Sequence, residues 1–185
     1  DPLEYRLKFL GESPRHKAAL ERVAKQAGWG TPLSDGHGRG IAINDWFPLN
    51  EAKTVVAQVA EVSVSKRGKL KVHRVDCVID CGIVINPDSV KAQMEGSIIM
   101  GMSAALFEQI TLEDGRVSQS NFDDYRIARM RDTPEINVSI VKSDTAPTGV
   151  GEPGTSPIVP AITNAIFAIT GKRLRRMPIG QQKLV

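Results

Sequence analysis

Apolar residues recur at helical spacing over the first thirty positions. In the first segment, leucines recur at helical spacing after Asp1. Asp1 is the expected N-cap, and Glu4 stands at the capping-box position. A second segment begins at Ser13-Pro14 and ends at Gly28, the expected C-cap. The apolar residues on the predicted inner sides are Leu3, Leu7, Leu10, Leu20, Val23, Ala24 and Ala27. Residues 1–30 are therefore predicted to form a helical lead-in.

The next part of the chain is typical of strands. Residues 30–40 are rich in glycine and other turn formers, which predicts a loop and a boundary after residue 30. Valine, isoleucine and alanine with partial alternation then predict strands over residues 40–47, 53–65 and 69–81. The turn at residues 66–68 makes Thr54 to Asp80 a long β-hairpin.

Helical patterns return after Asn86-Pro87-Asp88, which predicts a buried helix over residues 89–110. Within it, Gln93 and Glu95 are polar exceptions that fit either an exposed surface or a functional role. A turn at residues 113–116 and a strand at 136–142 follow. A last helix is predicted from Ser156, as N-cap, to Gly171. The blocks of strands and helices indicate an α+β class, a hairpin sheet packed against buried helices, over residues 31–185.

Composition narrows the function classes. The 185 residues are 41% hydrophobic, which is enough for a real core. Lys and Arg total 24 against 21 Asp and Glu, and aromatic residues are 5% of the chain, which argues against a nucleic-acid module. The basic cluster over residues 172–176 fits a solvated helix end. No apolar run is long enough to span a membrane, and we expect a portion of a longer protein whose targeting signal would lie upstream.

Cysteine and histidine suggest no metal site. Cys77 and Cys81 lie in one predicted strand, so their Cα atoms would be about 13 Å apart, too far for a disulfide. Two thiols also fall short of an iron–sulfur cluster. His16, His37 and His73 are isolated in the sequence, and no metal ligand is assigned among the protein side chains.

A glycine-rich loop is the strongest chemical signal in the chain. Residues 148–154 hold Glu152 among three glycines and before Pro153, which predicts a carboxylate of defined orientation at a helix N-terminus. The letters also match Gly-x-Gly-x-x-Gly, but no strand leads directly into the first glycine and no acidic residue follows Glu152. A nucleotide-binding oxidoreductase is therefore a weaker alternative, and a solvated turn is the simplest one.

Taken together, several segments resemble the molybdenum-binding subunit of the xanthine dehydrogenase and aldehyde oxidase superfamily, in its C-terminal part. The isoquinoline 1-oxidoreductase beta subunit is the most similar branch. The resemblance covers nearly the whole chain, and its most specific feature is the pairing of Gln-x-Glu-Gly with the later Gly-flanked Glu. The segments are 76–82, 86–88, 92–96, 119–122, 124–126 and 149–155.

The resemblance implies a molybdenum hydroxylase that oxidises an N-heterocycle or an aldehyde with oxygen derived from water. Glu152 would be the general base, Gln93 would contact the molybdopterin, and the amides of Gly149, Val150 and Gly151 would lie against it. The pterin would hold the metal, so protein metal ligands are not expected. The cytosine dinucleotide form is expected in the full-length protein, and the isolated fragment is expected to be folded, cofactor-free and inactive.

The resemblance also implies partners. Two cysteines cannot build an electron relay, so a separate small 2Fe–2S subunit, a small-molecule substrate and an electron acceptor are expected. Family members outside this branch often carry a second glutamine where this chain has Met100, and no role is assigned there. The substrate and the compartment, bacterial cytoplasm or periplasm, stay open. The alternative from another class is a noncatalytic assembly or binding module.

Overall fold

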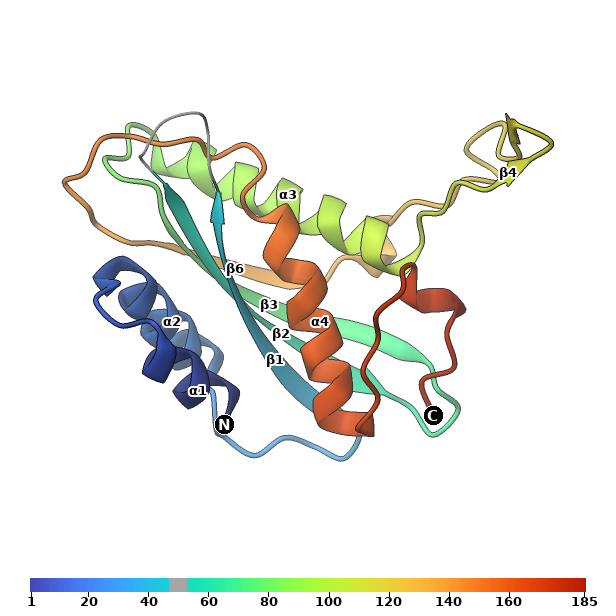
Figure 1. Cartoon of the computed structure of the whole chain (residues 1–185), viewed down its shortest axis with the longest axis horizontal. Helices are drawn as coiled ribbons and strands as arrows, with labels where there is room; N and C mark the ends of the chain where they lie inside the picture. Colours follow the sequence, from blue (N-terminus) through green and yellow to red (C-terminus); the bar gives the residue numbers. More distant parts are fainter. Residues whose placement is uncertain (47–52) are drawn as a thin grey trace.

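Helices cover both faces of a mixed β-sheet in the computed structural model, which describes residues 1–46 and 53–185 (Figure 1). This is the predicted α+β class. The helices are α1 (Pro2–Phe9), α2 (Pro14–Ala27), α3 (Pro87–Leu106) and α4 (Thr155–Thr170). The strands are β1 (His37–Trp46), β2 (Thr54–Val64), β3 (Leu70–Asp80), β4 (Leu112–Glu113), β5 (Arg116–Val117) and β6 (Glu135–Ile140). Short 3-10 turns are Met130–Asp132 and Ile179–Gln181.

The main sheet has the order β1-β2-β3-β6. The predicted hairpin is confirmed, because β2 and β3 pair antiparallel from Val55 opposite Asp80 to Val64 opposite Leu70. The strand predicted at residues 136–142 is β6, and it lies parallel to β3. The long connection between these parallel strands contains α3 and the β4–β5 hairpin, which stands away from the body in Figure 1.

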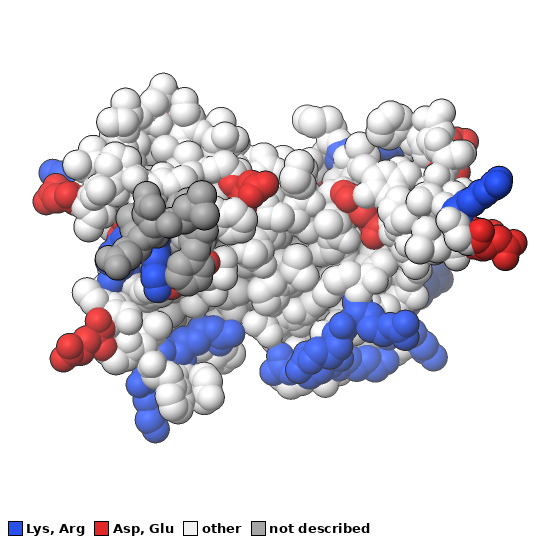
Figure 2. Space-filling view, turned by 45° about the horizontal axis from the view of Figure 1, so that its top comes forward, with Lys and Arg blue, Asp and Glu red and all other residues white. Residues whose placement is uncertain are grey.

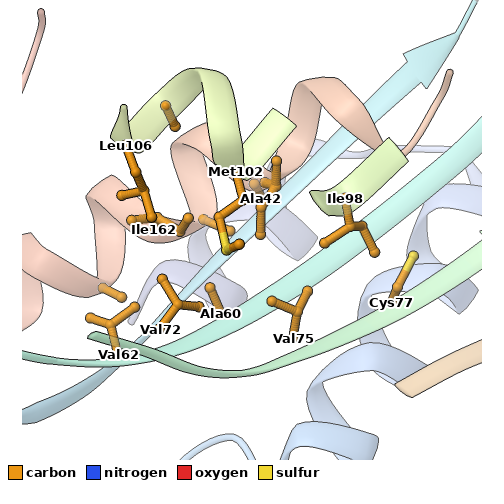
Figure 3. Packing of buried hydrophobic residues seen from close by; sticks show 14 of the residues in the cluster. Ala42, Ala60, Val62, Val72, Val75, Cys77, Ile98, Met102, Leu106 and Ile162 are labelled. Atoms are coloured by element: carbon orange, nitrogen blue, oxygen red, sulfur yellow. The ribbon is translucent and has the colours of Figure 1, made fainter. Parts of the chain in front are cut away.

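The strand period of two sends alternate side chains of β2 to opposite faces. Val56, Ala60 and Val62 join α3 and α4 in one core, whereas Val55 and Val59 join α2 in another. Figure 3 shows side chains of α3 and α4 above those of the strands: Ile98, Met102, Leu106 and Ile162 lie over Ala60, Val72 and Val75. Because both faces are covered, β2 is apolar along most of its length.

Local signals placed the helix ends well. The Asp1 carboxylate accepts from the amides of Leu3 and Glu4, as expected of an N-cap. Asn86 caps α3 in the same way. Gly28 and Gly171 end α2 and α4 with φ of 64° and 70°, the left-handed geometry that favours glycine. The turn between β4 and β5 is also where it was predicted.

The start of the first strand and the end of the long helix were predicted wrongly. The first strand begins at His37 inside the predicted loop, because His37 pairs with Ser63 across β2; the predicted end of that strand, Phe47, lies outside the described residues. The long helix ends at Leu106 instead of residue 110. Phe107 leaves helical geometry at φ −132°, and the amides of Phe107 and Glu108 both donate to the carbonyl of Ser103.

The two N-terminal helices lie on the sheet face opposite α3 and α4 (Figure 1). Their division from the rest of the chain after residue 30 stays a prediction. No helix in the described ranges has both the length and the apolarity to cross a membrane.

Candidate functional site at the loop before α4

The segment after β6 carries the glycine-rich loop to the end of β3. The Val141 amide donates to the carbonyl of Ile79 at 2.8 Å, and the Thr148 amide donates to the carbonyl of Cys81 at 2.9 Å. Between them, the Ile83 amide donates to the carbonyl of Thr145 at 2.9 Å. Residues 141–148 therefore run beside residues 79–83, and the loop begins where the β3 extension ends.

Two buried polar side chains of β2 form hydrogen bonds to the backbone of the loop. The Thr54 hydroxyl donates to the carbonyl of Gly149 at 2.7 Å and lies 2.6 Å from the Thr148 hydroxyl. The Gln58 amide donates to the carbonyl of Gly154 at 2.9 Å. Both side chains are completely buried. Sequence analysis missed this pair, although a threonine and a glutamine within an apolar strand were the available signal.

Helix α3 holds the other side of the loop. Gly154 lies so close to this helix that a Cβ atom at position 154 would collide with the Ser97 hydroxyl and would lie 3.3 Å from the Met94 carbonyl oxygen. A larger residue would therefore require the Ser97 hydroxyl to move away. The loop is therefore clamped between β2 and α3 immediately before α4 begins.

The predicted cap of α4 was wrong in detail. The loop does end at a helix N-terminus, but α4 begins at Thr155 with Gly154 at the N-cap, and no side chain caps it. The reason is a turn in which the Thr155 amide donates to the carbonyl of Glu152 at 2.9 Å, so the helix begins before Ser156. The Ser156 hydroxyl instead accepts from the Asn44 amide at 2.7 Å.

Glu152 is exposed at the outer side of this clamped loop. Across residues 1–46 and 53–185, its carboxylate has no hydrogen-bond or ion-pair partner. Arg173, a conceivable partner, donates to the Asn164 side-chain oxygen at 3.0 Å and stacks on Phe167. Within the described part of the chain, Glu152 therefore neither caps α4 with its side chain nor forms an ion pair.

The backbone beside Glu152 offers donors. Among the described residues, the amides of Gly149, Val150, Gly151 and Glu152 find no acceptor. The Val150 side chain packs against the core, and the Gly149 carbonyl is taken by Thr54, so the backbone is fixed while its amides stay accessible. Such a row of free N–H groups before a helix suits a polar or anionic ligand group.

Gln93 lies on the exposed side of α3, directly before Met94, whose carbonyl faces Gly154. Its side chain has no hydrogen-bond partner in the described ranges. One turn farther along, Gly96 is also exposed and has open space where a side chain would stand. Gln93 therefore directly precedes the α3 residue whose carbonyl faces Gly154 at the junction of the loop and α4, and Glu152 lies two positions before Gly154.

The cysteines belong to the core. Cys77 and Cys81 are both buried and free. Burial raises the pKa of the Cys77 thiol to about 12, and burial also raises the pKa of Cys81, so neither thiol is activated. No group of three or more His, Cys, Asp and Glu side chains that could hold a metal ion occurs in the part of the chain that the structure describes.

The prediction that the histidines are isolated was wrong for His37 and His73. Their rings stack with centroids 4.8 Å apart, and His73 Nε2 lies 2.7 Å from the Ser63 hydroxyl. A β-bulge explains the meeting, because β3 shifts register where Glu61 opposes Arg74 and Val62 opposes Val72, which leaves His73 as the extra residue. Sequence spacing does not reveal this bulge.

Comparison with known proteins identifies the family. The model of the molybdopterin cofactor-binding domain matches residues 7–134, more than half of the chain. The chain belongs to the molybdopterin cofactor-binding domain family. The matched range contains Gln93 and ends before the loop with Glu152.

Relatives of this molybdopterin cofactor-binding chain are oxidoreductases by name. The beta subunit of isoquinoline 1-oxidoreductase from Brevundimonas diminuta is 42% identical over 97% of this chain. A membrane-bound aldehyde dehydrogenase (pyrroloquinoline-quinone) from Gluconacetobacter polyoxogenes is 34% identical over 97%. This chain spans 23% and 25% of these two relatives, about a quarter of their length.

Solved structures show the same fold. Quinoline 2-oxidoreductase from Pseudomonas putida 86 matches with a TM-score of 0.65 at 23% identity, over 72% of this chain and 18% of that one. At this identity, the likeness supports the fold alone.

Proposed function

We propose that this chain is the C-terminal part of the molybdopterin-binding subunit of a molybdenum hydroxylase, with Glu152 as the general base. The whole enzyme would oxidise an N-heterocycle or an aldehyde with oxygen derived from water. The observation that carries the proposal is an exposed, unpartnered carboxylate, clamped beside free backbone amides, in a chain of a molybdopterin cofactor-binding family.

The residues present suit such a cofactor. The amides of Gly149, Val150 and Gly151 would donate to its polar atoms, and the exposed Gln93 side chain can both donate and accept on the other side of the junction. When bound, the molybdenum cofactor supplies the redox centre that takes two electrons from the substrate and provides the oxygen derived from water. We propose the cytosine dinucleotide form.

The task of Glu152 is to accept a proton at its carboxylate as the new carbon–oxygen bond forms. A general base must reach its proton at about 2.6–3.2 Å between heavy atoms, so its position matters as much as its pKa. Thr54, Gln58 and the glycine contact at position 154 would supply that position by fixing the loop on both sides.

Electrons must then leave the site. Both cysteines of this chain are buried core residues, so we propose that a separate small 2Fe–2S subunit carries the electrons to an acceptor. The word "subunit" in the name of the isoquinoline relative supports an assembly of more than one chain.

The proposal is tested on the complete subunit copurified with its partners. Molybdenum and pterin would be quantified, and isoquinoline and an aromatic aldehyde would be offered in isotopically labelled water. We expect stoichiometric molybdenum and label in the product. Turnover with a quinone cofactor and no molybdenum, as the name of the aldehyde dehydrogenase relative would suggest, refutes the proposal. Absence of both molybdenum and turnover points to an assembly module.

A further inference from the structure

A cleft lies beside the second half of α4, away from the α3 contact. It has a volume of about 590 Å³, within the size range of small-molecule pockets. Its walls come from α1, the start of β1, the second half of α4 and the segment that follows it. Side chains in the wall include Tyr5, Arg6, Trp29, Arg39, Phe167 and Arg173. None of the lining residues belongs to α3 or to residues 148–154, so this cleft is separate from the Glu152 site.

Three arginines line the cleft, but only one of them is neutralised. Arg39 binds the Glu61 carboxylate with two nitrogens, at 2.8 and 2.9 Å. Its charge is therefore already paired, and it only lines the cleft. Arg6 donates to the carbonyl of Pro2 at 2.8 Å, and Arg173 donates to the Asn164 side-chain oxygen at 3.0 Å. In the described ranges neither of these two guanidinium groups has a carboxylate partner, and each uses one of its nitrogens for these bonds.

Arg6 and Arg173 place two like charges on the walls of the same cleft. Partial burial, followed by the charge of Arg173, lowers the pKa of Arg6. Asp1 also lines the cleft, but its carboxylate accepts from the amides of Leu3 and Glu4 and from the Trp29 indole at 3.1 Å. An oxyanion between the two arginines would therefore relieve a repulsion that the described residues leave uncompensated.

Three aromatic side chains also line the cleft. Tyr5 is 64% exposed toward solvent, Trp29 is half-buried, and Phe167 lies beneath the Arg173 guanidinium, 3.4 Å from its ring centroid. Figure 2 shows Lys and Arg side chains gathered along the lower edge of the face it presents. Flat apolar walls around paired guanidinium groups favour a ring that bears a negative charge.

We propose that this cleft binds a flat aromatic molecule whose carboxylate or phosphate group lies between the guanidinium groups of Arg6 and Arg173. The site does not require the molybdenum cofactor, and it would serve a ligand other than the group held beside Glu152. Two classes of ligand could supply this anionic group: aromatic carboxylates and nucleoside monophosphates. Two guanidinium groups would bind the oxyanion of either class in the same way.

Calorimetric titration of the complete subunit tests the proposal, with benzoate and adenosine monophosphate as probes and with benzamide and adenosine as neutral analogues. At least one anion should bind, and which one binds identifies the source of the charge. Arg6→Gln and Arg173→Gln should each weaken binding by about 10-fold or more, because each removes a charged hydrogen-bond donor. Arg175→Gln is the matched control: it removes the same charge from the same exposed segment, outside the cleft.

The proposal is overturned if neither anion binds, if the neutral analogues bind as well, or if Arg175→Gln weakens binding as much as Arg173→Gln. Circular dichroism would show that the variants keep their helices. Subunit purified from cells grown without molybdate should bind the anion equally well. The anion titration and the molybdenum analysis therefore test separate proposals, and either one can be refuted without the other.

Discussion

Replacement of Gly154 by alanine tests the clamp that holds the candidate loop against α3. The new methyl group would collide with the Ser97 hydroxyl, while the next neighbours, the Met94 carbonyl oxygen at 3.3 Å and Ser97 Cβ at 3.4 Å, need only small shifts. Any movement of residue 154 also strains the buried hydrogen bond from Gln58 to its carbonyl. The substitution should therefore weaken both the packing of the loop against α3 and its hydrogen bond from Gln58.

The magnitude follows from two opposing effects. Overpacking of a buried contact costs about 1–3 kcal/mol. Gly154 has φ −74°, which alanine adopts readily, so reduced freedom of the unfolded chain returns about 0.4–1 kcal/mol. We expect a net loss of about 0.5–2 kcal/mol in the local stability of the loop and the first turn of α4.

Removal of the Ser97 hydroxyl should rescue the variant. Ser97→Ala alone removes a hydrogen bond to the Met94 carbonyl, worth about 1 kcal/mol or less. When Gly154→Ala is added to this variant, the hydroxyl with which the new methyl group would collide is no longer present. The double variant should therefore lose clearly less than the sum of the single losses. Hydrogen exchange at the Thr155 amide, which donates within the loop, measures the local opening free energy. Wild-type exchange in Gly154→Ala, or additive losses in the double variant, would refute the clamp.

Three further outcomes are expected. Gln93→Ala in the complete subunit should weaken cofactor retention by about 1–3 kcal/mol if its side chain binds the pterin; unchanged molybdenum and pterin content after gel filtration would contradict this. Arg15→Gln should lower thermal stability strongly, by about 3 kcal/mol, because Asp80 is 3% exposed and binds Arg15 at 2.7 Å, whereas the exposed neighbour Arg22→Gln should have little effect. Burial, followed by the charges of His37 and Lys71, lowers the pKa of His73, so its unfolded state binds a proton more readily as pH falls below about 6.5. Melting temperatures should fall over that range, and less so in His73→Gln; parallel pH curves would exclude this contribution.

Local chemistry accounts for what the sequence predicted well. The caps at Asp1, Gly28 and Gly171 depend on residues within a few positions of one another, so their signals survive without tertiary information. The β2–β3 hairpin was equally accessible, because a short turn joins two apolar segments. The α+β class followed from the order of these elements.

Contacts between distant residues account for what was missed. Gln58 and Gly154 are 96 positions apart. The glycines marked the loop at residues 148–154, but no sequence pattern indicates that Gln58 binds it. The start of α4 shifted because a turn at Glu152 competes with the expected Ser156 cap. The meeting of His37 and His73 depends on a single bulge in β3, which changes the register without a sequence signal.

The measurement that tests the central claim most directly is the turnover rate of Glu152→Gln in the complete enzyme. The amide keeps the size of the side chain, and Glu152 makes no contact with described residues that it would break, so stability and molybdenum content should stay normal. Loss of the base should lower kcat by about 10²- to 10⁴-fold, or about 3–5 kcal/mol of barrier. Glu113→Gln, an exposed glutamate on β4, is the control and should keep its rate. A Glu152→Gln enzyme with full cofactor and a kcat within several-fold of wild type would contradict the account.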